Sequence, residues 1–240
     1  MRVKAVLSYD GSFFRGFQKQ KNTRHTITTA LESALHALRI DTAVVGSGRT
    51  DAGVHATGQI IHFDLPEYWY DLHKLHYELD RRLKHIRIKH ITPVTNSFHA
   101  RFSAKKRIYR YVFKRKKPSL FEEKYIAHYK DFNPILLRQA LQQFEGTHDF
   151  RYFHKTGSDT HTTVRTIHKT RYRQQGDYYM LYFEADGFLR AQVRMMIDAA
   201  MRCAISQLTP EMLQEQIEHT HRYTTSLAPP SGLYLARILY

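Results

Sequence analysis

The chain has 240 residues, 42% hydrophobic and 25% charged, which fits a globular protein with one large domain or two small ones. No run approaches the roughly 20 apolar residues of a membrane-spanning helix, the N-terminus becomes polar too soon for a signal peptide, and one cysteine, Cys203, excludes a disulfide framework. Lysine and arginine total 37 against 22 acidic residues, a net charge of +15, so we expect a cytoplasmic protein that binds a polyanion and has no membrane partner.

In the first half of the chain, the apolar pattern predicts strands that alternate with helices. The first strand ends at the turn signal Asp10-Gly11, and leucines and alanines then recur at helical spacing. The expected elements, in order, are strand 3–9, helix 26–39, strand 43–46, strand 58–65, helix 71–83 and strand 86–94.

The second half repeats this order with longer insertions. A hairpin is expected around Gly176-Asp177, and one helix begins at Pro134 and ends just before Gly146. The expected elements are strands 107–114 and 125–129, helix 134–144, strands 164–173 and 178–186, helices 188–206 and 210–219, and strand 233–239.

These elements predict an α+β fold of two similar halves, residues 1–98 and 99–240. We expect mainly antiparallel sheets that join into one extended sheet, with helices on one face. The first half would carry the aspartate loop described below. A site in a cleft between the halves would be a common arrangement.

The basic residues are concentrated in one stretch. From Arg81 to Lys117 there are 14 lysines and arginines and no acidic residue. Tyr109, Tyr111 and Phe113 alternate with basic residues inside it, so a strand there could stack on bases with one face and meet phosphates with the other. The stretch could also be an ordinary solvated face. Nucleic acid is favoured over membrane as the partner, because amphipathic helical spacing is missing.

The most informative segment is the nine-residue run 48–56, Gly-Arg-Thr-Asp-Ala-Gly-Val-His-Ala. Small residues around Asp51 would let a bulky group approach its carboxylate. Arg49 would favour the ionised form of that carboxylate. Such a group can act as a nucleophile or a base, although aspartate and glycine are also ordinary turn residues.

Two nucleotide-binding motifs are excluded at this segment. Gly48 and Gly53 have P-loop spacing, but Val54-His55 stands where lysine and serine or threonine are needed. Asp51 occupies the place of the third glycine of a dinucleotide fingerprint.

No metal site is expected either, because the 16 histidines lack cysteine partners and a His-Glu-x-x-His motif. Arg190 and Arg194, one helical turn apart, could form a solvated helix face, or they could reach the Asp51 carboxylate or a phosphate.

Together these motifs resemble the TruA-type tRNA pseudouridine synthases. The resemblance is colinear and covers nearly the whole chain. It is carried by the segments 9–20, 48–56, 58–63, 98–104, 107–111, Phe188 with Val193-Arg194, and 228–235.

The resemblance implies an isomerase that converts uridine to pseudouridine in the anticodon stem-loop of tRNA, as a homodimer and without a metal or organic cofactor. It implies that Asp51 is the essential carboxylate and that Tyr109 packs on the target base. Arg194 would hold Asp51, and Arg49 would help to hold the flipped nucleotide. The alternative is a non-catalytic RNA-binding module that uses the basic stretch.

The chain also departs from the family pattern. Phe14 and Phe17 stand where the family usually has tyrosine and tryptophan, and Asp198 lies near a usual glycine. The turn Leu83-Lys84-His85-Ile86 is shorter and more basic than the family's. These changes lie in the scaffold and in the parts that face the RNA, so they bear on which uridines are modified more than on the reaction.

Overall fold

The computed structural model describes residues 1–157 and 161–240. The chain forms two compact units, unit 1 from residues 1–105 with 234–240, and unit 2 from residues 106–233. Each unit contains strands in mostly antiparallel pairs, together with helices, so the predicted α+β class is confirmed. The units differ from the expected halves 1–98 and 99–240, because the last strand of the chain returns to unit 1.

Unit 1 is built around β1 (Arg2–Tyr9). This strand pairs antiparallel with β3 (His55–Asp64) and β4 (Ile86–Pro93), and β10 (Leu233–Leu239) runs parallel to β3. The two-residue β2 (Val45–Gly46) pairs with β3. Side chains along β1 alternate between buried and half-buried, so one face of the strand is buried.

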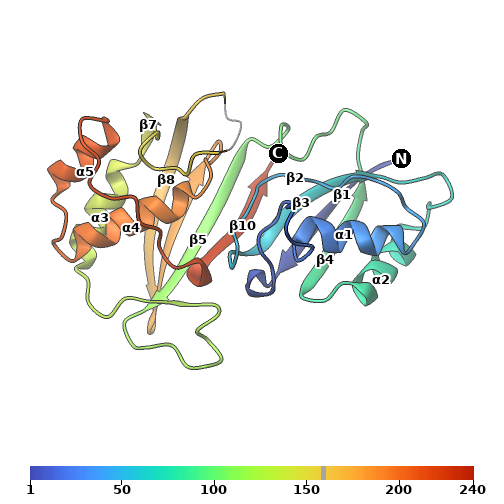
Figure 1. The fold of residues 1–240 in the computed structure, drawn as a ribbon, viewed down its shortest axis with the longest axis horizontal. Coiled ribbons are helices and arrows are strands. Elements are labelled where there is room, and N and C mark those ends of the chain that lie inside the picture. Colours follow the sequence, from blue (N-terminus) through green and yellow to red (C-terminus); the bar gives the residue numbers. More distant parts are fainter. Residues whose placement is uncertain (158–160) are drawn as a thin grey trace. The chain divides into compact units, whose positions relative to one another are not determined.

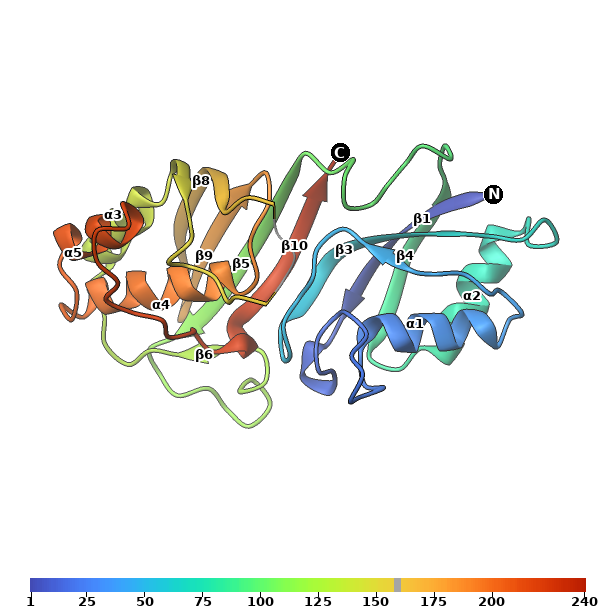
Figure 2. The ribbon, with the colours of Figure 1, turned by 45° about the horizontal axis from the view of Figure 1, so that its top comes forward.

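Two helices and one short 3₁₀ turn complete unit 1: α1 (Ile27–His36), α2 (Leu72–Arg82) and η1 (Gly11–Phe13). The Thr26 hydroxyl accepts from the Thr29 N–H at 3.2 Å, and the Asp71 carboxylate accepts from the Lys74 N–H at 2.9 Å. Both are N-cap bonds that satisfy otherwise orphaned donors. Both helices lie on the same side of the unit 1 strands (Figures 1 and 2).

Unit 2 has the strand order β5-β9-β8-β7. Helices α3, α4 and α5 pack on one another, and α4 crosses in front of the strands (Figure 2). The elements are β5 (Lys106–Lys114), β6 (Ala127–His128), α3 (Pro134–Gln143), β7 (Gly146–Asp149), β8 (Val164–Gln175), β9 (Tyr178–Ala185), α4 (Gln192–Ala204), α5 (Pro210–Ile217) and η2 (Pro230–Gly232).

The expected helix 188–206 was wrong at its start. Helix α4 begins at Gln192, because Ala191 has a left-handed backbone with φ +61° and cannot continue a helix toward the N-terminus. The Gln192 side chain instead accepts from the Leu189 N–H at 2.7 Å and orders the segment before the helix. Strand β3 begins at His55 instead of Gly58, and β7, η1 and η2 were not predicted.

In the part of the chain that the structure describes, no helix is both long enough and apolar enough to span a membrane.

Candidate functional site

The loop that carries Asp51 lies in unit 1 between β2 and β3. It is closed by a turn in which the Val54 N–H donates to the Asp51 carbonyl at 3.1 Å, and Gly53 adopts φ +76°. Positive φ at this position favours glycine. Asp51 is half-buried and Arg49 is exposed. The structure therefore presents the aspartate on a tight turn just before the first residue of the buried strand β3.

Gln59 holds the loop from below. Its side chain is fully buried on β3, its Nε2 donates to the Gly48 carbonyl at 2.5 Å, and its Oε1 accepts from the Gly48 N–H at 3.3 Å. An amide that both donates to and accepts from one residue fixes the backbone of that residue in place. Gly48 is three residues from Asp51, so the bracing acts directly on the aspartate turn.

A second buried contact braces Thr50, the residue before the aspartate. The Tyr9 hydroxyl lies 2.8 Å from Thr50 Oγ1, and Gln59 Nε2 donates to the Tyr9 hydroxyl at 3.5 Å. Burial raises the pKa of Tyr9, while its bonds with Thr50 and Gln59 act in the opposite direction. The raised pKa keeps this hydroxyl neutral, so the network beneath the loop carries no charge.

Two glycines let the segment before α1 pack against the back of the loop. Gly16 has φ +111°, and a Cβ there would lie 3.1 Å from the Thr50 carbonyl. A Cβ on Gly11 would lie 2.0 Å from the Val54 carbonyl, closer than real Cβ contacts allow. The Phe17 N–H donates to the Thr50 carbonyl at 3.0 Å, and the Gly11 N–H donates to His55 Nδ1 at 3.0 Å. Both ends of the aspartate loop are thus bonded to segment 11–17.

The other two predicted site residues belong to unit 2. Tyr109 lies on β5, 6% exposed, with its ring edge-on to Phe188 at 5.1 Å between centroids. Arg194 is half-buried in the first turns of α4, and its Nε donates to the Ala228 carbonyl at 2.8 Å. The Ala228 N–H donates back to the Arg194 carbonyl at 3.1 Å. Arg194 is therefore tied to the chain just before the Pro229-Pro230 turn.

The suggestion that the alternating aromatics of β5 could stack on bases is wrong for Tyr111 and Phe113. Tyr111 and Phe113 are fully buried, and the Phe113 ring packs within 5.3 to 5.6 Å of Phe132, Tyr179 and Tyr129. These rings fill the core of unit 2, so on this strand Tyr109 alone of the three remains a candidate for contact with a base.

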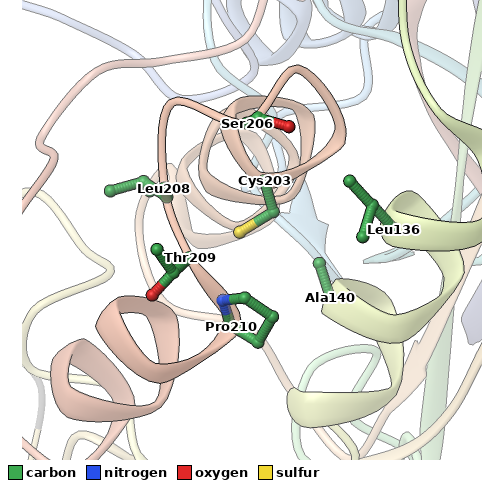
Figure 3. Close-up of a pocket in the computed structure, with 7 residues that line it drawn as sticks. All are labelled: Leu136, Ala140, Cys203, Ser206, Leu208, Thr209 and Pro210. Carbon is green, nitrogen blue, oxygen red and sulfur yellow. The ribbon is translucent and has the colours of Figure 1, made fainter.

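Unit 2 also contains a small apolar pocket at the ends of α3, α4 and α5 (Figure 3). Its volume is about 210 Å³, and the Cys203 thiol, whose pKa burial raises to about 11, points into it. No predicted site residue lines it, and the lining residues supply neither a carboxylate nor a cation. They are Leu136, Ala140, Cys203, Ser206, Leu208, Thr209 and Pro210. This pocket does not fit the chemistry expected of Asp51.

Comparison with known proteins decides the family. A model of the tRNA pseudouridine synthase family matches residues 5–103 and 140–240. The chain belongs to the tRNA pseudouridine synthase family. It is similar along its whole length to proteins named tRNA pseudouridine synthase A: 37% identical to that of Helicobacter hepaticus (99% of this chain, 98% of that protein), 36% to that of Campylobacter jejuni (100% of both) and 35% to that of Wolinella succinogenes (98% and 93%).

The match to the tRNA pseudouridine synthase family includes some of the predicted site residues but not all of them. Arg49, Asp51 and Arg194 lie inside the two matched stretches, while Tyr109 lies in the unmatched residues 104–139. The bracing residues Tyr9, Gly16 and Gln59 lie within the family-like segments 9–20 and 58–63, but their bracing role is not predicted from the sequence. A glutamine in an otherwise apolar strand was the available signal, because a buried amide needs hydrogen-bond partners.

Proposed function

We propose that this member of the tRNA pseudouridine synthase family uses Asp51 as its single catalytic carboxylate to isomerise uridine to pseudouridine in the anticodon stem-loop of tRNA. The observation that carries the proposal is the bracing of the Asp51 turn by buried hydrogen bonds from Gln59 and Tyr9. A reactive group held by packed and bonded neighbours loses little freedom when it meets its substrate.

The chemistry needs one carboxylate because no water enters. The target uridine leaves its stack, at a cost of about a few kcal/mol. The N-glycosidic bond between ring N1 and the sugar breaks, the uracil turns within the site, and its C5 carbon bonds to the same sugar carbon. C5 then loses its proton and N1 gains one, so the product is an isomer of the starting uridine. Glycosidases need a second carboxylate to activate water, and this isomerisation has no such step. Attack by Asp51 on the sugar, its attack on the base and its removal of a sugar proton are all compatible with this role.

The remaining roles are part of the same proposal. Tyr109 packs on the flipped base, Arg194 holds the Asp51 carboxylate, and Arg49 holds the flipped nucleotide. Arginine suits both tasks, because its planar fork matches carboxylates and phosphates. The proposal includes a homodimer that binds one tRNA with both subunits, a cytoplasmic location, and a reaction without a metal or organic cofactor.

The decisive experiment maps pseudouridine on unmodified tRNA transcripts incubated with wild type, Asp51→Asn and a control, Asp41→Asn. Asp41 is an exposed aspartate of the same unit. We expect new pseudouridine in the anticodon stem-loop with wild type and the control only, while Asp51→Asn still binds tRNA. Retained activity in Asp51→Asn rejects the catalytic assignment. Binding without modification by every variant favours the alternative, a non-catalytic RNA-binding module.

A further inference from the structure

Unit 1 has an open groove of about 540 Å³ that the proposed chemistry does not use. Its lining residues come from α1 and its C-cap, from η1 and the segment that follows it, and from the last residue of α2 with the turn after it. The lining residues are Phe13, Phe14, His25, Ala30, Ser33, Ala34, Ala37, Arg82, Leu83, Lys84 and His85. A volume of this size suits a ligand of nucleotide dimensions.

Small side chains on α1 leave the groove open. Ala30, Ser33, Ala34 and Ala37 follow the i, i+3, i+4, i+7 spacing of one helix face. The large apolar residues of the same helix, which include Leu31 and Leu35, are buried elsewhere in unit 1. On α1 the groove is thus lined by small side chains with one hydroxyl among them.

A stacked aromatic pair is among the residues that line the groove. The rings of Phe13 and His85 are stacked, with centroids 3.5 Å apart and planes 7° from parallel. Phe13 is 46% exposed. The backbone holds the pair, because the Asp10 N–H donates to the His85 carbonyl at 3.0 Å and His85 has φ +63°. A planar base could continue this stack.

The charges in the groove are of one sign. Arg82 and Lys84 line it, and the described lining residues contain no carboxylate. Arg82 pairs with Glu78 on its own helix, whereas Lys84 is an exposed lining residue. His25 adds an exposed imidazole. Cationic and aromatic groups without a carboxylate fit a base with its phosphate.

We propose that this Phe13–His85 groove binds one unpaired nucleotide of the tRNA substrate, with the base on the Phe13–His85 stack and the phosphate near Lys84. The inference rests on the proposed function, because it takes tRNA as the ligand. It names residues at two places where the chain departs from the family pattern, Phe14 and the turn 83–86. The groove lies beside the Asp51 loop, because Asp10 bonds to His85 while its neighbour Gly11 packs on Val54. The nucleotide proposed for the groove is therefore a different one from the uridine that meets Asp51.

The test measures the dissociation constant of an unmodified tRNA transcript and the single-turnover rate at saturating tRNA. Phe13→Leu keeps apolar volume but removes the stacking face, and Phe13→Trp restores it. We expect Phe13→Leu to weaken binding roughly tenfold, with Phe13→Trp near wild type and the saturating rate unchanged. Lys84→Gln should weaken binding and reduce the salt slope by about one. Matched controls are Tyr70→Leu, an aromatic that is 84% exposed, and Lys74→Gln, an exposed lysine on α2.

Each result decides the proposal. Equal dissociation constants for Phe13→Leu and Tyr70→Leu, with both proteins folded by thermal unfolding, overturn it. Unchanged tRNA binding together with a smaller sedimentation coefficient overturns it in favour of a contact between copies of the chain. A lower saturating rate with unchanged binding also overturns it. If wild type binds tRNA but forms no pseudouridine, the proposed function fails. The dissociation constants of Phe13→Leu and Tyr70→Leu then still show whether the groove binds tRNA.

Discussion

Gln59 and Gly48 bond to each other twice, once through the amide nitrogen and once through the amide oxygen of the glutamine. The glutamine lies on β3 and the glycine lies three residues before Asp51. The buried amide thereby determines where the aspartate turn begins.

Gln59→Leu removes both bonds and leaves the N–H and carbonyl of Gly48 without their buried partner. We expect a loss of unfolding free energy of about 2 kcal/mol or more and a large fall in the rate of pseudouridine formation at saturating tRNA. Chemical denaturation and single-turnover kinetics measure the two effects. Gln142→Leu, at an exposed position on α3, is the control. An unchanged rate in Gln59→Leu would show that the brace does not serve the reaction.

A substitution at Gly16 tests a second contact of the Asp51 loop, the one between segment 11–17 and the Thr50 carbonyl. A side chain there must adopt φ +111° and meet the Thr50 carbonyl, so Gly16→Ala should cost roughly 1–3 kcal/mol and lower activity. Gly176→Ala is the matched control, because Gly176 also has positive φ, at +55°, but a Cβ there meets nothing within 4 Å. We expect the control to lose stability without losing saturating rate. Equal rate losses in both variants would contradict a specific role of Gly16.

Much of this architecture could be predicted from the sequence because it depends on local pattern. Apolar periodicity located β1, α1 and most other elements to within a few residues. The start of α4 was missed because Ala191, a good helix former, adopts left-handed φ under tertiary constraint. The aromatic run on β5 was misinterpreted because alternation shows that two faces differ, but not which face is buried.

In the candidate site, too, the local pattern could be predicted from the sequence and the long-range contacts could not. The segment around Asp51 stands out because its glycines and charges are close in sequence. Its supports, Tyr9 and Gln59, come from two other strands, and sequence order carries no distance between them. Such long-range bonds become visible only when the strand register is known.

The carboxylate of Glu122 predicts an acid-sensitive contact in unit 2. Its pKa is lowered to about 2, chiefly because it accepts from the Ser119 N–H, with further bonds from Lys114 and Tyr178. Because the folded pKa is depressed, the stabilisation is complete above the reference value of 4.5 and is lost as pH falls toward about 2. Urea midpoints of wild type should therefore fall more steeply across this window than those of Glu122→Gln.

The control for this pH dependence is Glu123→Gln, which removes one carboxylate from the next, exposed position. It should retain the wild-type steepness. Parallel curves for wild type and Glu122→Gln would mean that the contact with Ser119, Lys114 and Tyr178 contributes nothing in solution.

Helix α4 holds the segment before β10 at two points one helical turn apart. Asp198 accepts from the Thr224 hydroxyl at 3.0 Å, and Arg194 donates to the Ala228 carbonyl at 2.8 Å. Asp198 also accepts from Arg202 Nε at 2.8 Å. Thr224→Val removes the first tie and keeps the side-chain shape. We expect about 1 kcal/mol of lost stability and a saturating rate lowered several-fold, with tRNA binding unchanged.

A double-mutant cycle separates this positioning role of Thr224 from a merely structural one. If Thr224 acts on the rate by holding the segment that Arg194 binds, Thr224→Val should change the rate little once Arg194 is alanine. The loss of unfolding free energy caused by Thr224→Val should persist in the Arg194→Ala background, because the substitution removes the bond to Asp198 in both backgrounds. Thr220→Val, at an exposed threonine of the same region, controls for the substitution itself. Rate effects of Thr224→Val and Arg194→Ala that simply add would show that the two ties act independently, and Arg194 would then be oriented by groups other than this segment.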